Sequence, residues 1–263
     1  MNIFVCIKQV PNTTEVKWDL EKGTLIREGV ESIVNPFDLY AVEEGLKIKE
    51  KIGGDTKVIA ITMGPPQAKE ALRDVIAMGA DEGILVSDRA FAGADTLATS
   101  YSLYKAIEKM GDIGIILAGK QAIDGDTGQV GPGIASWFGY PQITYVKKIV
   151  EIKDNKMVAE RLTDYGYDIV ESELPVVLTV VKEINEPRLP SLRGKMKAKK
   201  FEPTVFTAND INADENRIGL QGSPTQVKKV FSPPKKEGGE KFEGEAEELS
   251  EILFGKLKEL KIV

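Results

Sequence analysis

The residues best suited to ligand chemistry lie in one glycine-rich stretch, residues 119–133, which follows a predicted buried strand and precedes a short helix predicted at 134–138. Glycines let backbone amides approach an anion closely, and a helix N-terminus adds a favourable dipole. The stretch could therefore hold a diphosphate, with Thr127 adding a hydroxyl donor. It matches neither the Walker A pattern nor G-x-G-x-x-G, so an ordinary connection between strand and helix is an equal alternative at this point.

Three other loops are expected to meet this stretch at one edge of a sheet. Residues 8–11, 63–65 and 92–96 each follow a predicted strand. In a doubly wound sheet, ligands bind outside the carboxyl ends of the strands. Each loop alone is ordinary turn chemistry, but their convergence favours a nucleotide site.

The composition excludes several kinds of chemistry. Histidine is absent, which removes Ser-His-Asp triads, Cys-His dyads and His-ligated metals or haem. The single cysteine, Cys6, cannot form an internal disulfide, and it cannot hold a structural zinc or an iron–sulfur cluster within this chain. Its place inside a predicted strand is typical of a small buried hydrophobe. We therefore expect no metal site, and we single out no residue as catalytic.

Charge and hydropathy limit the classes of partner. The chain has 263 residues, is 42% hydrophobic and carries a formal net charge of −6. Its scattered charges argue against a nucleic-acid-binding face, which needs clustered Lys and Arg, and the one basic cluster, residues 195–200, indicates a solvated loop. No signal-like segment opens the chain, and no apolar run approaches the ~20 residues that a bilayer span needs. We expect a cytoplasmic protein without a membrane span.

The elements that must position the glycine-rich stretch alternate regularly through the first 137 residues. Predicted strands at 3–8, 57–62, 84–86 and 113–118 are separated by predicted helices at 38–51, 66–78 and 95–110. This alternation predicts an α/β fold with a doubly wound, mainly parallel sheet of the Rossmann-like type. Extended runs at 143–152, 156–162, 167–173 and 175–181 follow. They predict antiparallel additions to the same sheet.

The remaining chain predicts two further segments after an α/β domain at 1–201. Residues 202–244 lose periodicity and collect turn residues, which indicates an extended linker arm. Residues 245–263 regain helical periodicity, with a stripe of apolar side chains at Leu249, Ile252, Leu253, Leu257 and Leu260. A free helix could not keep that stripe in water without a partner surface.

Several ordered motifs carry a family resemblance that covers nearly the whole chain. They are Val5-Cys6-Ile7-Lys8-Gln9-Val10-Pro11, Asn35-Pro36-Phe37-Asp38, Met63-Gly64-Pro65, Ala77-Met78-Gly79-Ala80-Asp81, Gly119-Lys120-Gln121-Ala122-Ile123-Asp124 and Asn185-Glu186-Pro187-Arg188. In this order they resemble the β subunit of electron transfer flavoprotein. The sequence departs from the family at Asp164-Tyr165-Gly166, where a more acidic and glycine-rich turn is usual. That departure concerns a hairpin rather than the cofactor.

The resemblance implies an obligate heterodimer with an α subunit and a nucleotide bound in the β subunit. Carried over position by position, the implied nucleotide contacts are Cys6, Asn35, Pro36, Phe37, Asp38, Met63, Gly64, Thr96, Gly119, Gln121, Asp126, Thr127, Gly128, Gln129, Val130 and Gly131. The nucleotide is AMP in the mitochondrial-type members and a second FAD in the electron-bifurcating members. Residues 125–133 are similar to the bifurcating form, and their small side chains leave room for a dinucleotide.

The function implied by the resemblance is flavin-based electron bifurcation. Electrons from NADH would divide between a low-potential acceptor, ferredoxin or flavodoxin, and the FAD of the α subunit, which serves a flavin-dependent dehydrogenase. Residues Leu192, Arg193, Lys195 and Met196 resemble the family's docking loop for dehydrogenases, and the C-terminal helix would pack on the α subunit.

Two other interpretations stay open. One is an AMP-binding electron carrier of the same family, which has no NADH chemistry of its own. The other is a nucleotide-dependent ligase or ATP pyrophosphatase, a different class of protein with a similar sheet. That class needs a Ser/Gly-rich phosphate loop after the first strand, which residues 8–13 do not supply.

Overall fold

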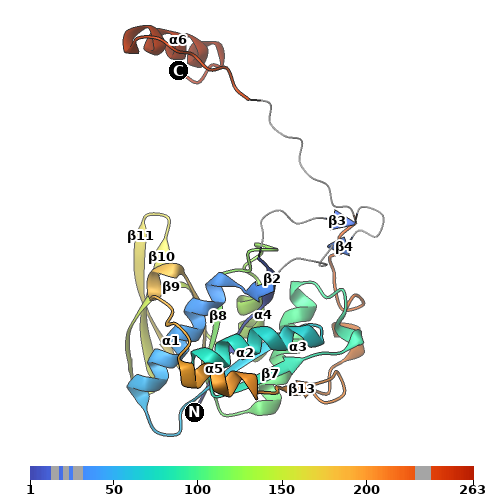
Figure 1. Cartoon of the computed structure of the whole chain (residues 1–263). Coiled ribbons are helices and arrows are strands. Elements are labelled where there is room, and N and C mark those ends of the chain that lie inside the picture. The colour runs from blue at the N-terminus through green and yellow to red at the C-terminus, as the bar shows by residue number, and fades with distance from the viewer. Residues whose placement is uncertain (13–17, 20–23, 26–31, 229–237) are drawn as a thin grey trace. The chain divides into compact units, whose positions relative to one another are not determined.

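A nine-stranded sheet organises the larger part of the chain, in the order β11-β10-β9-β12-β8-β1-β6-β7-β13 (Figure 1). The computed structural model describes residues 1–12, 18–19, 24–25, 32–228 and 238–263. From β12 to β13, each strand of the sheet runs parallel to its neighbours. These strands are, in spatial order, β12 (Val176–Val180), β8 (Ile113–Gly119), β1 (Asn2–Cys6), β6 (Lys57–Met63), β7 (Glu82–Val86) and β13 (Thr204–Phe206). The predicted α/β class with a mainly parallel sheet is confirmed.

The strands after residue 141 extend this sheet on one side. β9 (Gln142–Lys153) pairs parallel with β12, whereas β10 (Lys156–Thr163) and β11 (Gly166–Glu173) continue as an antiparallel ribbon. The expected antiparallel pairing is therefore right for β10 and β11 but wrong for β12, which lies between β8 and β9. All five residues of β12 are buried. A fully apolar strand fits the centre of a parallel sheet, where helices cover both faces.

Helices cover both faces of the sheet. α1 (Pro36–Ile52) and α2 (Lys69–Met78) pack on one face, and α3 (Thr96–Met110) and α4 (Val130–Phe138) pack on the other. The shorter helical elements are η1 (Pro66–Ala68), η2 (Arg89–Phe91), η3 (Lys182–Ile184), α5 (Leu192–Lys199) and η4 (Glu215–Arg217). Two small antiparallel strand pairs lie outside the large sheet: β2 (Gln9–Pro11) pairs with β5 (Ser32–Val34), and β3 (Trp18–Asp19) pairs with β4 (Thr24–Leu25).

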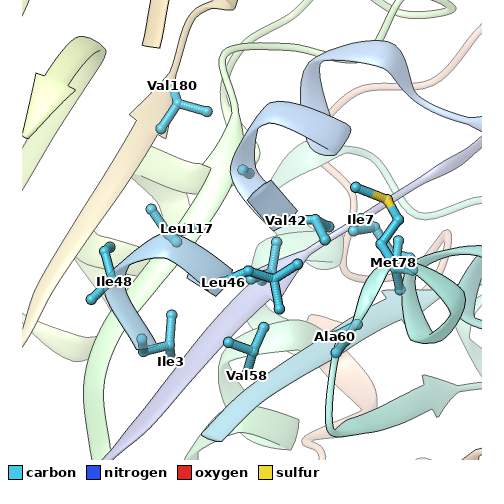
Figure 2. Packing of buried hydrophobic residues seen from close by; sticks show 14 of the residues in the cluster. Ile3, Ile7, Val42, Leu46, Ile48, Val58, Ala60, Met78, Leu117 and Val180 are labelled. Atoms are coloured by element: carbon cyan, nitrogen blue, oxygen red, sulfur yellow. The ribbon is translucent and has the colours of Figure 1, made fainter. Parts of the chain in front are cut away.

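The core forms because side chains alternate along the buried strands. In β1, Ile3 and Val5 face α1 and α2, whereas Phe4 and Cys6 face α3 and α4. Figure 2 shows the first of these clusters, in which side chains of α1 lie among those of the strands: Val42, Leu46 and Ile48 beside Ile3, Val58, Ala60, Leu117 and Val180. This packing fixes α1 on the sheet, and with it the residues at the helix N-terminus.

The first structural unit, Met1–Lys228, extends beyond the boundary expected at residue 201. β13 adds to the edge of the sheet, and Ile211 and Ile218 are buried. Polar contacts rather than periodic apolar residues hold this segment: the Asp214 amide donates to the Tyr101 hydroxyl, and Thr225 donates to the Asp95 carboxylate. Residues 229–237 of the expected linker lie outside the described residues.

The second unit contains α6 (Ala246–Glu259), close to the helix expected at 245–263. No residue of α6 is buried, and Leu253 and Leu260 of the predicted apolar stripe are 60% and 68% exposed. Among the helices in the described ranges, none has both the length and the apolar character that a bilayer span requires.

Candidate functional site

The site lies at the carboxyl edge of the sheet between β1 and β8. The chain leaves β1 toward α1 on one face of the sheet, and it leaves β8 toward α4 on the other face. Neighbouring strands whose connections go to opposite faces form a topological switch point, where α/β proteins bind ligands. The two loops that flank this crevice follow Cys6 and Gly119.

A buried pair, Asn35 and Asp38, joins these loops to the first turn of α1. The Asp38 carboxylate accepts hydrogen bonds from the Lys8 amide at 2.7 Å, from Asn35 Nδ2 at 2.9 Å and from the Gly119 amide at 3.2 Å. Asn35 also donates to the Gln121 carbonyl at 2.9 Å, and its Oδ1 accepts from the Ile123 amide at 3.1 Å. We call Asn35 and Asp38, together with the hydrogen bonds of their side chains, the junction of the site. Pro36 occupies the first turn of α1, where its missing N–H costs nothing.

Burial raises the pKa of two titratable groups at this site, the Asp38 carboxyl and the Cys6 thiol. Burial raises the pKa of the Asp38 carboxyl to about 7, although the hydrogen bonds from Asn35, Lys8 and Gly119 act in the opposite direction. Burial also raises the pKa of the Cys6 thiol to about 12, and the charge of Asp38 adds to this effect. The thiol is neutral and packs inside the cluster under α3 and α4, so it is not a reactive nucleophile.

The first half of the glycine-rich stretch, residues 119–126, uses most of its polar groups inside the protein. The amides of Gly119 and Ile123 donate to the junction, and the Asp126 amide donates to the Ala122 carbonyl at 2.9 Å. Gln121 Nε2 donates to Asp126 Oδ1 at 2.8 Å, and the Lys8 ammonium pairs with the Asp124 carboxylate at 2.6 Å. This half is a fixed support, and the groups named here are not free for a ligand.

The second half differs, because its amides point to no acceptor. Within the described residues, the backbone N–H groups of Thr127, Gly128, Gln129, Val130 and Gly131 donate to no protein group. Gly128 adopts a positive φ of 63°, which lets the chain turn into the helix. Consecutive free amides at a helix N-terminus are a binding site for anions. We call residues 127–131 the amide nest.

The helix that follows begins four residues earlier than predicted, at Val130 rather than at residue 134. Pro132 falls in the first turn, where a helix tolerates proline. Gly131 and Gly133 are glycines for reasons of packing: a Cβ at these positions would lie 2.6 Å from Thr179 Cγ2 and from Ser100 Oγ, respectively. These two glycines bring α4 close to β12 and α3, which positions the nest.

The other two predicted loops contribute less. Thr96, the first residue of α3, donates through its hydroxyl to Gln129 Oε1 at 2.9 Å and so supports the nest. Asp95 caps α3 by accepting from two amides of its first turn, so that helix end is closed to an anion. The Gly64 amide donates to the Val86 carbonyl at 3.1 Å, and Met63 packs beside the cluster under α3 and α4.

Sequence reasoning missed Lys120. Its ammonium lies 4.9 Å from the centre of the Phe37 ring, and no carboxylate of the described chain pairs with it. The available signal was its place directly after the buried strand β8. It brings a positive charge to the same edge of the sheet.

The predicted docking residues lie away from this site. Leu192, Arg193, Lys195 and Met196 belong to α5, which packs against α2 (Figure 1). Leu192 and Met196 are 79% and 63% exposed, and the neighbouring Leu189, which sequence reasoning did not include, is 89% exposed. The basic cluster expected as a loop is largely helical, because Ser191 caps α5 by accepting from the Gly194 amide at 2.9 Å.

Comparison with known proteins identifies the family. Residues 22–211 match the model of the electron transfer flavoprotein domain. The chain is 51% identical to an electron transfer flavoprotein subunit beta of Thermoanaerobacterium thermosaccharolyticum, over 100% of both chains. It is 50% identical to the caffeyl-CoA reductase-Etf complex subunit CarD of Acetobacterium woodii, also over 100% of both chains. Protein FixA of Azorhizobium caulinodans is 41% identical over 89% of this chain and 85% of its own length.

Electron transfer flavoproteins pair a β subunit with an α subunit, and the fold, the switch point and the amide nest agree with a subunit that takes part in binding a flavin or another nucleotide. The chain belongs to the electron transfer flavoprotein family, as a homologue of its β subunits.

Proposed function

We propose that this subunit binds FAD at the edge between β1 and β8 and that its heterodimer with the α subunit carries out flavin-based electron bifurcation. The amide nest is the observation that carries the proposal, because five consecutive free amides suit a diphosphate and serve no other purpose in the described structure. The alternative within the family is an AMP-binding electron carrier.

The residues present fit a dinucleotide. The amides of residues 127–131 would hold the diphosphate, with the Thr127 hydroxyl as an additional donor, and the Lys120 ammonium would offset negative charge at the same edge. The junction at Asn35 and Asp38 holds the loops that follow β1 and β8 in place. Met63, Gly64, Thr96 and the Cys6 backbone are the further contacts that we propose for the nucleotide. FAD, when bound, would supply the redox chemistry of the proposed bifurcation, namely hydride transfer from NADH and single-electron transfer to ferredoxin or flavodoxin and to the α-subunit flavin.

Only part of the glycine-rich stretch favours FAD over AMP. Gly131 and Gly133 are small because of Thr179 and Ser100, so they do not discriminate between the two nucleotides. At Gly125, in contrast, a Cβ would meet no atom within 4 Å. Open space at this position leaves room for the second half of a dinucleotide.

The nucleotide content of the purified heterodimer tests the proposal. Nucleotides released by acid would be separated by chromatography and counted per heterodimer. We expect two FAD, one of them in this subunit. One FAD with one AMP would contradict bifurcation and support the electron carrier.

The exposed face of α5 is proposed as the docking surface for a flavin-dependent dehydrogenase. Leu192 and Met196 place apolar side chains among the cations Arg193 and Lys195. Such a surface fits an apolar pocket rimmed by carboxylates. The name of the Acetobacterium relative joins its Etf to a caffeyl-CoA reductase, which supports a reductase of this class as the partner.

The C-terminal helix is proposed to pack on the α subunit. None of its side chains is fully buried within its own unit, and burying the five of the predicted apolar stripe could contribute on the order of 5–10 kcal/mol before ordering costs. Deletion of residues 229–263 leaves the first unit whole. We expect the shortened subunit to remain folded and to bind the α subunit much more weakly, and unchanged co-purification would contradict the proposal.

A further inference from the structure

One arginine, Arg188, fastens the segment before α5 to α1. Its guanidinium donates hydrogen bonds to two glutamates, Glu43 and Glu50, that lie two turns apart on that helix. Nε and Nη2 donate to the two oxygens of Glu43 at 2.8 and 3.0 Å, and Nη1 donates to Glu50 at 2.6 Å. The backbone amide of Arg188 also donates to Glu43, at 3.1 Å. Arginine suits this role because its planar fork matches carboxylates in a fixed geometry.

The burial of the partners makes this contact specific. The Glu43 side chain is only 7% exposed, whereas that of Glu50 is 59% exposed. A nearly buried carboxylate needs its donors, because water cannot replace them. Asn185 makes a second contact with the same helix, since its Nδ2 donates to Glu44, the residue after Glu43, at 2.9 Å and to the Tyr40 carbonyl at 3.1 Å.

The other end of the segment is fixed by α2. A Cβ on Gly194 would overlap the carbonyl oxygen of Ala77, so α5 can approach α2 this closely only with glycine there. Lys197 Nζ donates to the Ala80 carbonyl at 3.0 Å, and Ala198 is buried. The segment from residue 185 to residue 199 is therefore attached to one helix at each end, and between the attachments Leu189, Leu192 and Met196 point outward with most of their surface exposed.

We propose that Arg188 is a positioning residue for partner docking: its fork onto Glu43 and Glu50 holds residues 187–196 in the conformation in which Leu189, Leu192 and Met196 meet the dehydrogenase. The proposal rests on the docking function of α5 proposed above. The physical basis is preorganisation, since a segment that is ordered before binding loses less conformational entropy when the partner arrives.

Amide hydrogen exchange tests the positioning directly. In the heterodimer, Arg188→Gln is expected to speed exchange in residues 187–196 by about tenfold, without a change in β1, β6 or β8. Arg188→Lys keeps the charge without the fork and should restore only part of the protection. Lys156→Gln is the control, because it removes an exposed ion pair in another part of the chain, with Glu171 on the β10–β11 ribbon. Unchanged exchange in Arg188→Gln would overturn the proposal.

Binding to the caffeyl-CoA reductase of Acetobacterium woodii, used as the probe, tests the consequence. Arg188→Gln should raise its Kd by about tenfold, and it should add little in a Leu192→Ala background, because both changes act through one surface. Full additivity would overturn the positioning role. If Leu192→Ala weakens binding and Arg188→Gln does not, only the positioning role fails. If Leu192→Ala also has no effect, the docking assignment fails and the positioning role fails with it.

Discussion

The two halves of residues 119–133 both contain glycines, but their roles are different. In the half that ends at Asp126, amides and side chains are joined to one another and to the junction at Asn35 and Asp38. In the amide nest, five amides have no acceptor within the described structure. The comparison teaches that a glycine-rich stretch is not uniformly a ligand site. One half mainly builds the support, although its Gln121, Ala122 and Asp124 amides also have no acceptor among the described residues, and only the other half presents five consecutive free amides.

The largest expected effect comes from adding one methyl group at Gly119, in the half formed by residues 119–126. In Gly119→Ala the new Cβ would lie 2.5 Å from Asp38 Oδ1 and 2.7 Å from Phe37 Cβ. Overpacking against a fixed junction should cost on the order of 3 kcal/mol. The melting temperature of the heterodimer should fall by roughly 6–12 °C.

Gly125→Ala is the matched control for this change, because the same methyl group would meet no atom within 4 Å. We expect a stability change within about 0.5 kcal/mol. Both glycines lie in residues 119–126, so equal losses in the two variants would mean that Gly119 is no more tightly packed than the exposed Gly125, and the packing role assigned to Gly119 at the junction would be wrong.

The pH dependence of stability tests the ionisation of Asp38 at the junction. The pKa of Asp38 is raised from 3.8 to about 7 in the folded protein, so between these values the folded state binds a proton that the unfolded state releases. Stability from this group is therefore present at low pH and is lost as pH rises toward 7, by at most about 2 kcal/mol between pH 5 and pH 7. The wild-type melting temperature should fall in this range relative to that of Asp38→Asn. Parallel profiles would show that Asp38 ionises normally.

Asn35→Ala tests the junction from its other side chain. The change leaves the Ile123 amide without its acceptor and the Gln121 carbonyl without its donor. An unsatisfied buried group costs about 1–3 kcal/mol, so we expect a loss of about 2 kcal/mol, measured by thermal unfolding, together with weaker nucleotide retention. Full stability with normal nucleotide content would show that the junction does not support the loop.

Thr127→Val is expected to have the smallest effect on stability, because Thr127 is exposed and makes no contact that the fold needs. It removes one hydroxyl donor from the nest, so nucleotide affinity in this subunit should fall by about tenfold, while the α-subunit flavin is retained. Thr163→Val, on the exposed end of β10, is the control. Equal loss of both flavins in Thr127→Val would indicate general unfolding. The amide nest would then be part of the structural support and not a separate binding element.

Much of the fold could be predicted because its signals are local. The buried strands and the apolar stripe that runs from η1 into α2, formed by Ala68, Leu72, Val75 and Ile76, follow from periodicity alone. The end of the first unit could not be predicted, because contacts between distant polar groups, such as Thr225 with Asp95, hold residues 204–228 in place. The start of α4 was also missed, since Gly131 and Pro132 resemble helix breakers until Thr179 explains the glycine.

The sequence by itself determined the α/β class, the family resemblance and the stretch that contains the candidate site, because strand burial and glycine-rich turns are properties of neighbouring residues. Only the tertiary structure decided which half of that stretch is open, that β12 lies between β8 and β9, and that Arg188 joins the docking segment to α1. The physical reason is the same in each case: a donor is free or used, and a strand is central or peripheral, according to partners that lie far away along the chain.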